Sequence, residues 1–502
     1  MYNCAIKSGK IVNNTASSIL QFAICLTFVF HLLICSVGIF TGYSTNFFAY
    51  VNTYVLFFLI VLYLFSVGIN KHFLYFCFCV CFFIFLMGQK FFVVLDGGSY
   101  DTFLTFKGLQ LSSWEYFTFI NLMYFSLLGC FIGYFVSKPQ KYVINKSETG
   151  SPSVDMGKMR AIIRVLYIIT FICASIMQFE IVLAKRGMSY TDGYLINVDV
   201  NPVIKIGNYL FLGMAFLYLS CRPSKKEMIA IIVSFMFVDG FLQMFVGRRA
   251  LLAQSLFFII WFTICYLKAD EKKFTFKHFV WLCIFGVMLI FLFWIVEVIR
   301  SGSSFDGTSF LEIIENFCIS TGGSDSTIAN IIHYGDEFPK EGYVYYFSPI
   351  KDALFDNVVV RQFTSILTGT DSASVAQGLE YLGRHDSFAH WLSYTVNSDL
   401  YLKGYGMGSS YIAETYFAFG TLGVVIFNLI LGFLIRKLST FKNESNRIYL
   451  KATCLFVVHN LFVLPRGGVF SSATDFLYFA VALLIIKFIS SLAGSKNEVL
   501  RS

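Results

Sequence analysis

A series of apolar runs, each about 20 residues long, is the feature that most constrains this chain, because about 20 apolar residues in a helix cross the hydrocarbon core of a bilayer. Of the 502 residues, 57% are hydrophobic and 14% are charged, whereas a soluble domain is about 45–50% apolar and about 25% charged. We therefore predict an all-α polytopic membrane protein with about twelve transmembrane helices. Either of two runs, 47–68 and 73–95, could instead be re-entrant, so eleven or thirteen spans remain alternatives. The runs lie near 18–40, 47–68, 73–95, 115–136, 160–184, 203–221, 227–246, 249–267, 278–299, 410–435, 447–464 and 472–492.

Positive charges between the runs indicate how the chain crosses the membrane. With a cytoplasmic N-terminus, 21 Lys and Arg residues fall in inner segments and six fall in short outer connections. Membrane proteins concentrate Lys and Arg in their cytoplasmic loops, so we expect both termini in the cytoplasm. The cations are spread over many connections, and the net charge of +8 therefore does not indicate a nucleic-acid partner.

One connection, residues 300–408, differs from all the others. It contains no 18-residue apolar stretch, and it has thirteen Asp and Glu against six Lys and Arg. The parity of the spans places it outside, where we expect a compact lid that is mostly helical or irregular. Helical spacing is present at Ser309–Cys318 and Asp325–Ile332. The predicted organisation is thus nine spans in 1–299, a large periplasmic loop in 300–408, and three spans with a short cytoplasmic tail in 409–502.

The cysteines do not predict a disulfide framework or a metal site. Most of the thirteen lie inside apolar runs, where a thiol behaves as a small apolar side chain. The sequence contains no CxxC motif and no His/Cys spacing typical of metal ligands. We expect no metal and no cofactor.

Arginines on the side that should be poor in cations are the first candidates for function. Arg248 and Arg249 follow Gly247 at the turn of an apolar hairpin, and Arg466 precedes two glycines. A guanidinium can bind a phosphate through two hydrogen bonds, so we predict a phosphate-binding role for these three residues. Arg300 and Arg361 could complete the set. The alternatives are contact of Arg248 and Arg249 with lipid headgroups and a simple turn at Arg466.

A glycine-rich stretch leads directly into the tenth run. Gly404, Gly406, Gly408 and Ser409 precede the predicted helix, and a loop that opens a helix exposes free N–H groups and the positive end of the helix dipole. This pattern predicts an anion-binding site. Glu414 lies in the first turns of the same run, where a carboxylate needs a partner or an aqueous cavity. It is a candidate catalytic base, with helix capping as the alternative.

Two further candidates, Asp386 and His390, lie shortly before the glycines. An imidazole has an ordinary pKa near neutrality and can act as a general base. A carboxylate such as that of Asp386 can accept the proton of a hydroxyl. For His390, an ordinary histidine of the lid is an equally good interpretation.

The motifs at these positions resemble a known family. The Gly-Arg-Arg hairpin, the large late outer loop and Gly-x-Gly-x-Gly-Ser-Ser-Tyr-Ile-Ala-Glu-Thr-Tyr-Phe-Ala-Phe-Gly-Thr-Leu-Gly (404–423) are similar to those of the oligosaccharide repeat-unit polymerases, the Wzy or O-antigen polymerase family. The resemblance covers roughly residues 200–470. The five spans before this region contribute only hydropathy.

This resemblance implies a lipid-carrier-dependent glycosyltransferase (GT-C-like) of the bacterial inner membrane. Such an enzyme is expected to join undecaprenyl-diphosphate-linked oligosaccharides on the periplasmic face, without a nucleotide sugar or an obligatory metal. A chain-length regulator protein is a further candidate partner. The chemistry agrees with the charges, because a diphosphate leaving group needs fixed cations and an acceptor hydroxyl needs a base.

Two other functions share this architecture. A ligase that transfers a finished glycan to another lipid acceptor would differ only in its acceptor. A flippase for lipid-linked oligosaccharides would also have about twelve spans and buried cations, but it would not need a large acidic outer loop between two spans. A sensor or a channel is the residual alternative.

Overall fold

The fold is seen in a computed structural model of the chain. It describes residues 2–41, 45–103, 108–137, 156–188, 191–196, 200–245, 248–266, 309–368, 376–440 and 448–499, with residue 198 and a few residues between 284 and 294. The description below concerns these residues.

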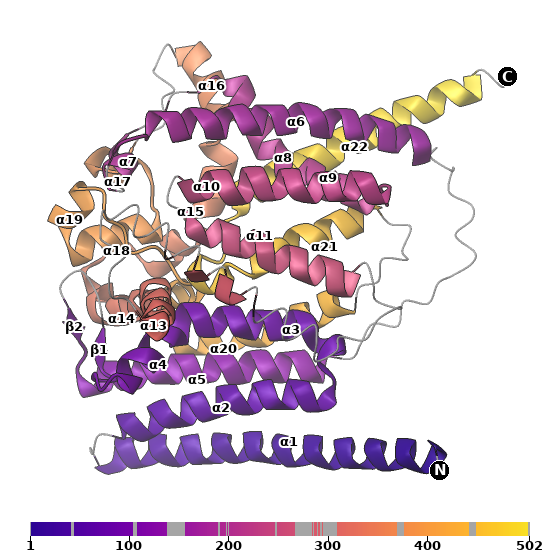
Figure 1. The fold of residues 1–502 in the computed structure, drawn as a ribbon. Coiled ribbons are helices and arrows are strands. Elements are labelled where there is room, and N and C mark those ends of the chain that lie inside the picture. Colours follow the sequence, from indigo (N-terminus) through magenta and orange to yellow (C-terminus); the bar gives the residue numbers. More distant parts are fainter. Residues whose placement is uncertain are drawn as a thin grey trace.

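Long apolar helices dominate the structure and confirm the predicted all-α polytopic membrane protein (Figure 1). Seven of the described helices are long and apolar enough to cross a membrane. They match the first six predicted runs and the tenth. Their bounds are α1 (Tyr2–Thr41), α2 (Asn46–Val67), α3 with η1 and α4 (Ile69–Phe82, Phe83–Met87, Gly88–Leu95), α5 (Ser113–Val136), α6 (Met156–Ala184), α8 (Pro202–Ser220) and α20 (Tyr411–Ser439).

The other predicted runs form shorter or interrupted helices, and the total number of spans stays a prediction. Most of the ninth run, 278–299, lies outside the described residues. Two of these shorter runs contain a π-helical segment, as the third run does at η1. Such a segment widens the helix locally and is often found at functional sites. The helices are α9, η2 and α10 (Lys225–Phe235, Met236–Leu242, Gln243–Phe245), α11 and η3 (Arg249–Trp261, Phe262–Tyr266), α21 (Ile448–Leu461) and α22 (Ala473–Val499).

Helices α5 and α20 pack closely through glycines. A Cβ atom on Gly133 would lie 2.0 Å from the carbonyl oxygen of Leu429, and one on Gly432 would lie 2.0 Å from that of Cys130. Small residues at such contacts let two helix backbones approach within a membrane. This contact fixes the position of α20, whose first turn carries Glu414.

A small hairpin between α4 and α5 was not anticipated from the sequence. Strand β1 (Thr102–Phe103) pairs antiparallel with β2 (Leu109–Gln110). The hairpin is too short to show a strand-like alternation of apolar residues, which is the signal that predicts strands.

In the lid, the segment 300–408, most of the described residues, 309–368 and 376–408, are helical. The expected helices at Ser309–Cys318 and Asp325–Ile332 are present as α13 and α14, and Ser309 and Glu312 form a capping box at the start of α13. The helices of the lid are α13 (Phe310–Thr321), α14 (Asp325–Tyr334), η4 (Gly335–Glu337), α15 (Gly342–Phe355), α16 (Val358–Thr368), α17 (Leu379–Arg384), α18 (Phe388–Val396) and α19 (Ser398–Leu402).

The lid gathers mainly around one end of the bundle, and both chain termini lie at the opposite end (Figure 1). Its helices are bound to the spans. The side-chain amide of Gln89 in α4 donates to the carbonyl of Ile319 at 2.9 Å, and His333 Nδ1 lies 2.7 Å from Glu115 Oε1 at the start of α5. Helix α15 packs against α20 and α22. The lid is therefore packed against the spans at this end of the bundle.

Candidate functional site

Glu414 lies buried at the start of α20, with 5% of its surface exposed. Two donors bind its carboxylate. The hydroxyl of Ser409 donates to Oε1 at 2.7 Å, and the backbone N–H of Val469 donates to Oε2 at 2.9 Å. These bonds come from two separate segments of the chain, because Ser409 precedes α20 and Val469 lies between α21 and α22. The carboxylate is thus held in one orientation.

The backbone at Gly468 approaches this carboxylate closely. A Cβ atom at this position would lie 2.1 Å from Glu414 Oε1 and 2.6 Å from Oε2. Such distances are far below a van der Waals contact, so only glycine fits here while Glu414 keeps its place. The loop that follows η5 (Leu464–Arg466) therefore forms part of the Glu414 site.

A cavity of about 390 Å³ opens beside Glu414, and we call it the Glu414 cavity. The lid forms its other wall through α15, α16 and the loop before α18. Its polar lining residues are Tyr209, Tyr345, Ser348, Asp352, Asp356, Asn357, Arg361, Tyr381, His385, Ser387, Ser409, Glu414, Ser471 and Thr474.

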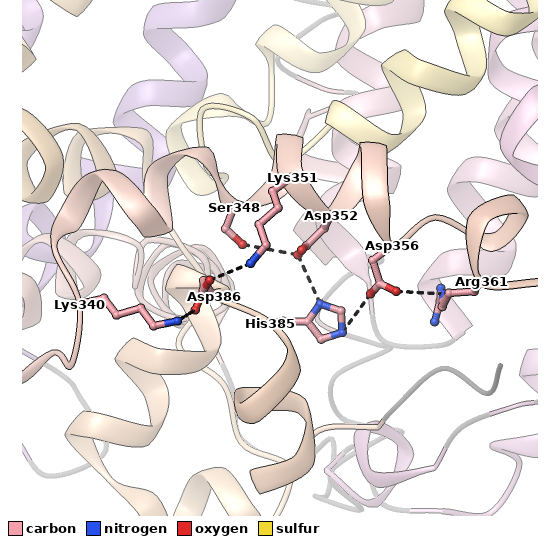
Figure 2. A network of polar contacts seen from close by, with 8 residues as sticks. All are labelled: Lys340, Ser348, Lys351, Asp352, Asp356, Arg361, His385 and Asp386. Carbon is pink, nitrogen blue, oxygen red and sulfur yellow. Dashed lines mark hydrogen bonds and ion pairs between the residues drawn. The ribbon is translucent and has the colours of Figure 1, made fainter. Parts of the chain in front are cut away.

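A chain of charged contacts runs along the lid side of this cavity (Figure 2). His385 lies between two carboxylates, with Nδ1 3.4 Å from Asp352 Oδ2 and Nε2 3.4 Å from Asp356 Oδ2. Arg361 Nε lies 3.7 Å from Asp356 Oδ1. Each of these four residues lines the cavity, so their polar side chains are available to whatever occupies it.

Asp386 forms the other end of the same network. Lys340 Nζ lies 2.6 Å from its Oδ1, and Lys351 Nζ lies 3.1 Å from its Oδ2 (Figure 2). Burial by itself raises the pKa of Asp386, but the hydrogen bonds and charges of the two lysines outweigh it, and the pKa lies below its ordinary value. The carboxylate stays ionised and bound to both lysines at neutral pH.

A second cavity, of about 610 Å³, adjoins the first, and we call it the Arg248 cavity. It is bounded by α6, α8, η2, α11, α21 and α22. Tyr209, Val358, Arg361 and Ser471 line both cavities, so the two spaces meet at these residues. Four cationic side chains line the Arg248 cavity: Lys185, Lys205, Arg248 and Arg361.

The cations of this cavity are close enough to influence one another. Burial lowers the pKa of Lys185, and the positive charge of Arg248 lowers it further. Like charges gathered in this way repel unless an anion lies between them. Asp239 and Asp475 also line this cavity, but the four cations outnumber these two carboxylates, so the lining fits an anionic ligand.

The structure brings together only part of the residues that were proposed from the sequence. Glu414, Ser409, Arg248 and Arg361 line the two joined cavities. The side chain of Arg249 and the whole of Arg300 lie outside the described residues.

Arg466 and the three glycines lie elsewhere. Arg466 is exposed, and its guanidinium lies 5.9 Å from the ring centre of Phe85. Gly404 has a φ of 87°, and a Cβ atom there would lie 2.2 Å from the carbonyl oxygen of Thr191. Within the described part of the chain, neither Arg466 nor Gly404, Gly406 or Gly408 is among the residues that line the two cavities.

His390 also lies away from the two cavities, among aromatic rings of the lid. Its Nδ1 lies 3.0 Å from the hydroxyl of Tyr401, and its ring lies 4.1 Å from that of Tyr381. Burial, and then the charge of His385, lowers the pKa of His390 to about 4. The imidazole is therefore neutral at physiological pH.

Several residues of the site were not selected from the sequence. Asp352 and Asp356 are ordinary members of an acidic segment, and their pairing with His385 depends on the fold of the lid. Lys205 carried a usable signal, because it is a cation one turn inside an apolar run, and such residues mark ligand sites in membranes. Among the described residues, no group of three or more His, Cys, Asp or Glu could hold a metal ion.

Comparison with known proteins gives one family. Residues 22–497 match the family described as O-antigen polysaccharide polymerase Wzy. The match extends the resemblance seen in the motifs of roughly 200–470 to nearly the whole chain, including the first five spans. No curated protein and no solved structure matches the chain significantly.

Proposed function

Because the chain belongs to the O-antigen polysaccharide polymerase Wzy family, we propose that it joins undecaprenyl-diphosphate-linked repeat units with release of the diphosphate lipid. Membership of the family makes it a multi-pass protein of the inner membrane and a glycosyltransferase-type enzyme of O-antigen polymerisation, with a lipid-linked oligosaccharide as substrate. The leaving group, the roles of individual residues and the orientation in the membrane belong to the proposal.

One observation carries it: a buried, positioned carboxylate and a group of cations line two cavities that meet. In the proposed reaction, the acceptor hydroxyl attacks the anomeric carbon of the donor sugar. The bond from that carbon to the diphosphate oxygen breaks, and its electron pair leaves with the diphosphate. The hydroxyl proton passes to the carboxylate of Glu414.

Glu414 is suited to the base role by its geometry. Ser409 and the N–H of Val469 each occupy one oxygen, which fixes the carboxylate while each oxygen keeps further acceptor capacity. A base must lie within hydrogen-bond reach of the proton that it removes. Glu414 lines the cavity, so an acceptor hydroxyl bound there could reach it.

The cations of the Arg248 cavity are suited to the leaving group. Negative charge develops on the diphosphate as the sugar departs, and fixed cations in a site with little water stabilise that charge strongly. Arg361 is placed at the junction with the Glu414 cavity. We therefore assign it to the phosphate nearest the reacting carbon, and Lys185, Lys205 and Arg248 to the rest of the diphosphate.

Asp386 and His390, the other candidate bases, receive different roles in this proposal. Asp386 is bound by two lysines, and His390 lies outside the two cavities with its pKa lowered to about 4 by burial. We infer that both residues maintain the folded lid.

The orientation we propose has the lid, and the end of the bundle that holds both cavities, on the periplasmic side and both termini in the cytoplasm. The opposite placement of lid and termini (Figure 1) supports it, as does the excess of Lys and Arg in the segments predicted to be inside. In a variant without reactive native cysteines, a single cysteine at the exposed Leu379 of the lid should react with a membrane-impermeant reagent in intact cells. A cysteine at Lys225 should react only after lysis, and labelling of both positions from one side would contradict the orientation. A GT-C-like architecture and a chain-length regulator as partner stay predictions.

Replacement of Glu414 by Gln tests the catalytic proposal. A general base contributes about 10²- to 10⁴-fold to a rate, so Glu414→Gln should leave only traces of polymer in a strain that lacks the native gene. If Glu414 only interacts with the helix dipole, Glu414→Gln should cost about 0.3–1 kcal/mol of stability, and polymer should persist. Glu380→Gln is a matched control, because Glu380 is an exposed lid residue paired with Arg384.

The product that remains in such a strain distinguishes the alternatives. A polymerase defect leaves a single repeat unit attached to the lipid core. A ligase or flippase defect abolishes attachment altogether, and that result would refute the proposal.

A further inference from the structure

The Arg248 cavity buries polar side chains of three apolar helices. Gln178 of α6, Gln254 of α11 and His459 of α21 line it and are 4%, 3% and 3% exposed. Among the described residues, Gln178 Oε1 and Gln254 Oε1 have no hydrogen-bond partner, whereas His459 Nε2 faces the carboxylate of Asp239 at 3.5 Å. Two amide oxygens of two different helices thus remain available to a ligand in one cavity.

Such atoms are costly to bury without a partner. A buried donor or acceptor that stays unsatisfied costs about 1–3 kcal/mol, and nearly all buried polar groups in proteins are hydrogen-bonded. In the hydrocarbon region, polar side chains typically face a cavity or a substrate path. A polar ligand in the cavity would satisfy both amide oxygens at once.

Hydrogen bonds fix the positions of Gln254 and His459 in the lining of the Arg248 cavity. The Nε2 of Gln254 donates to the backbone carbonyl of His459 at 3.0 Å and lies 3.1 Å from its Nδ1. On the other side of the ring, His459 Nε2 lies 3.5 Å from Asp239 Oδ2, which also accepts from the hydroxyl of Ser255 at 3.1 Å. Because Nε2 of Gln254 is engaged, its Oε1 keeps a fixed position.

The composition of the lining indicates the class of ligand. Amide side chains offer both a donor and an acceptor, which suits hydroxyl and acetamido groups of sugars. A phosphate has acceptor oxygens only and is matched by the cations of the same cavity. The uncharged and acidic polar residues of the lining are Gln178, Asn208, Tyr209, Asp239, Gln243, Gln254, His459, Asn460, Ser471, Ser472 and Asp475.

We propose that the Arg248 cavity is a saccharide-binding subsite, in which the amide side chains of Gln178 and Gln254 bind sugar hydroxyls of the donor oligosaccharide while the cations hold its diphosphate. This inference rests on the proposed function, because it names which part of the substrate occupies this cavity. The volume of about 610 Å³ is in the range of cavities that enclose a ligand of a few rings.

The test measures the binding of the sugar part and of the diphosphate part of the substrate separately. Purified full-length protein in lipid nanodiscs is assayed with the lipid-linked repeat unit, and undecaprenyl diphosphate without sugar serves as a competitive inhibitor. Gln254→Leu should raise KM about tenfold, the equivalent of about 1.4 kcal/mol, and leave inhibition by undecaprenyl diphosphate unchanged. Arg248→Ala should weaken that inhibition.

Gln21→Leu is the matched control, because Gln21 of α1 donates to the hydroxyl of Tyr63 at 2.6 Å and lies outside both cavities. Gln178→Leu carries the test if Gln254→Leu does not fold. An unchanged KM in the folded variant would overturn the inference, and so would an equal loss of affinity for the sugar-free inhibitor. Failure of the wild-type protein to form polymer would instead refute the proposed function.

Discussion

A methyl group at position 468 should disable the site although no ionisable residue is replaced. In Gly468→Ala, the new Cβ atom would lie 2.1 Å from Glu414 Oε1 and 2.7 Å from its carboxyl carbon. An ordinary contact begins near 3.4 Å, so the carboxylate must move by about 1.3 Å or the loop must move away. Either movement breaks or lengthens the hydrogen bonds from Ser409 and Val469.

The size of the expected effect follows from this displacement. A misplacement of about 1 Å in a catalytic site can cost about 10²-fold in rate. Weakening of two hydrogen bonds to a carboxylate costs about 1–3 kcal/mol each in stability. We therefore expect Gly468→Ala to lose about 10²-fold in polymerisation rate and to unfold at a lower temperature.

A double-mutant cycle isolates the contact with Glu414. In a Glu414→Ala background the carboxylate is gone, and Gly468→Ala should then cost little further stability. The interaction between the two changes should be about 0.5–3 kcal/mol, the range for residues in contact. Thermal unfolding of the four purified proteins measures it, and polymer formation measures the rate.

A neighbouring glycine supplies the comparison. A Cβ atom on Gly467 would lie 3.3 Å from its nearest neighbour, the hydroxyl of Ser471, so Gly467→Ala should lose much less activity than Gly468→Ala. The reasoning fails if Gly468→Ala polymerises at the wild-type rate. It also fails if Gly468→Ala costs the same stability with Glu or Ala at position 414.

Two further predictions concern the lid. Arg361→Ala should reduce the polymerisation rate strongly. Arg361→Lys should restore little of this rate, because an ammonium lacks the two-donor geometry of a guanidinium. A rate of Arg361→Lys equal to that of the wild-type protein would count against a phosphate contact. Burial lowers the pKa of His390 from 6.5 to about 4. As the pH falls, His390 is therefore protonated in the unfolded chain before it is protonated in the folded protein. The free energy of unfolding should for this reason decline between about pH 6.5 and 4. Thermal unfolding at stepped pH measures this decline, and His390→Gln should flatten it; an unaltered slope would show that other groups cause it.

The sequence was sufficient for features that depend on local patterns. Apolar runs of about 20 residues predicted the long helices, and Ser309 with Glu312 three residues later is a local signal for the start of α13. Glu414 was selectable because a carboxylate near the start of an apolar run is costly without a partner.

The assembly of the site depends on contacts that no local pattern records. Glu414 binds the N–H of Val469, 55 positions further along the chain. Arg361 reaches the junction of the cavities through the packing of α16 on α8. Arg248 and Arg466 both neighbour glycines in short connections, yet Arg248 lines a cavity and Arg466 lies over Phe85. Only the fold distinguishes them.

The dimensions of the two joined cavities bear on how polymer length could be set. With about 390 and 610 Å³, they can enclose short oligosaccharides at the reacting ends and no more. Sugars beyond these ends would lie outside the two cavities, so a chain of ten repeat units and one of fifty would present the same end to Glu414. The two cavities alone would then provide no measure of polymer length. The distribution of product lengths would then depend on how often the growing chain dissociates, and on any second protein that holds it in place.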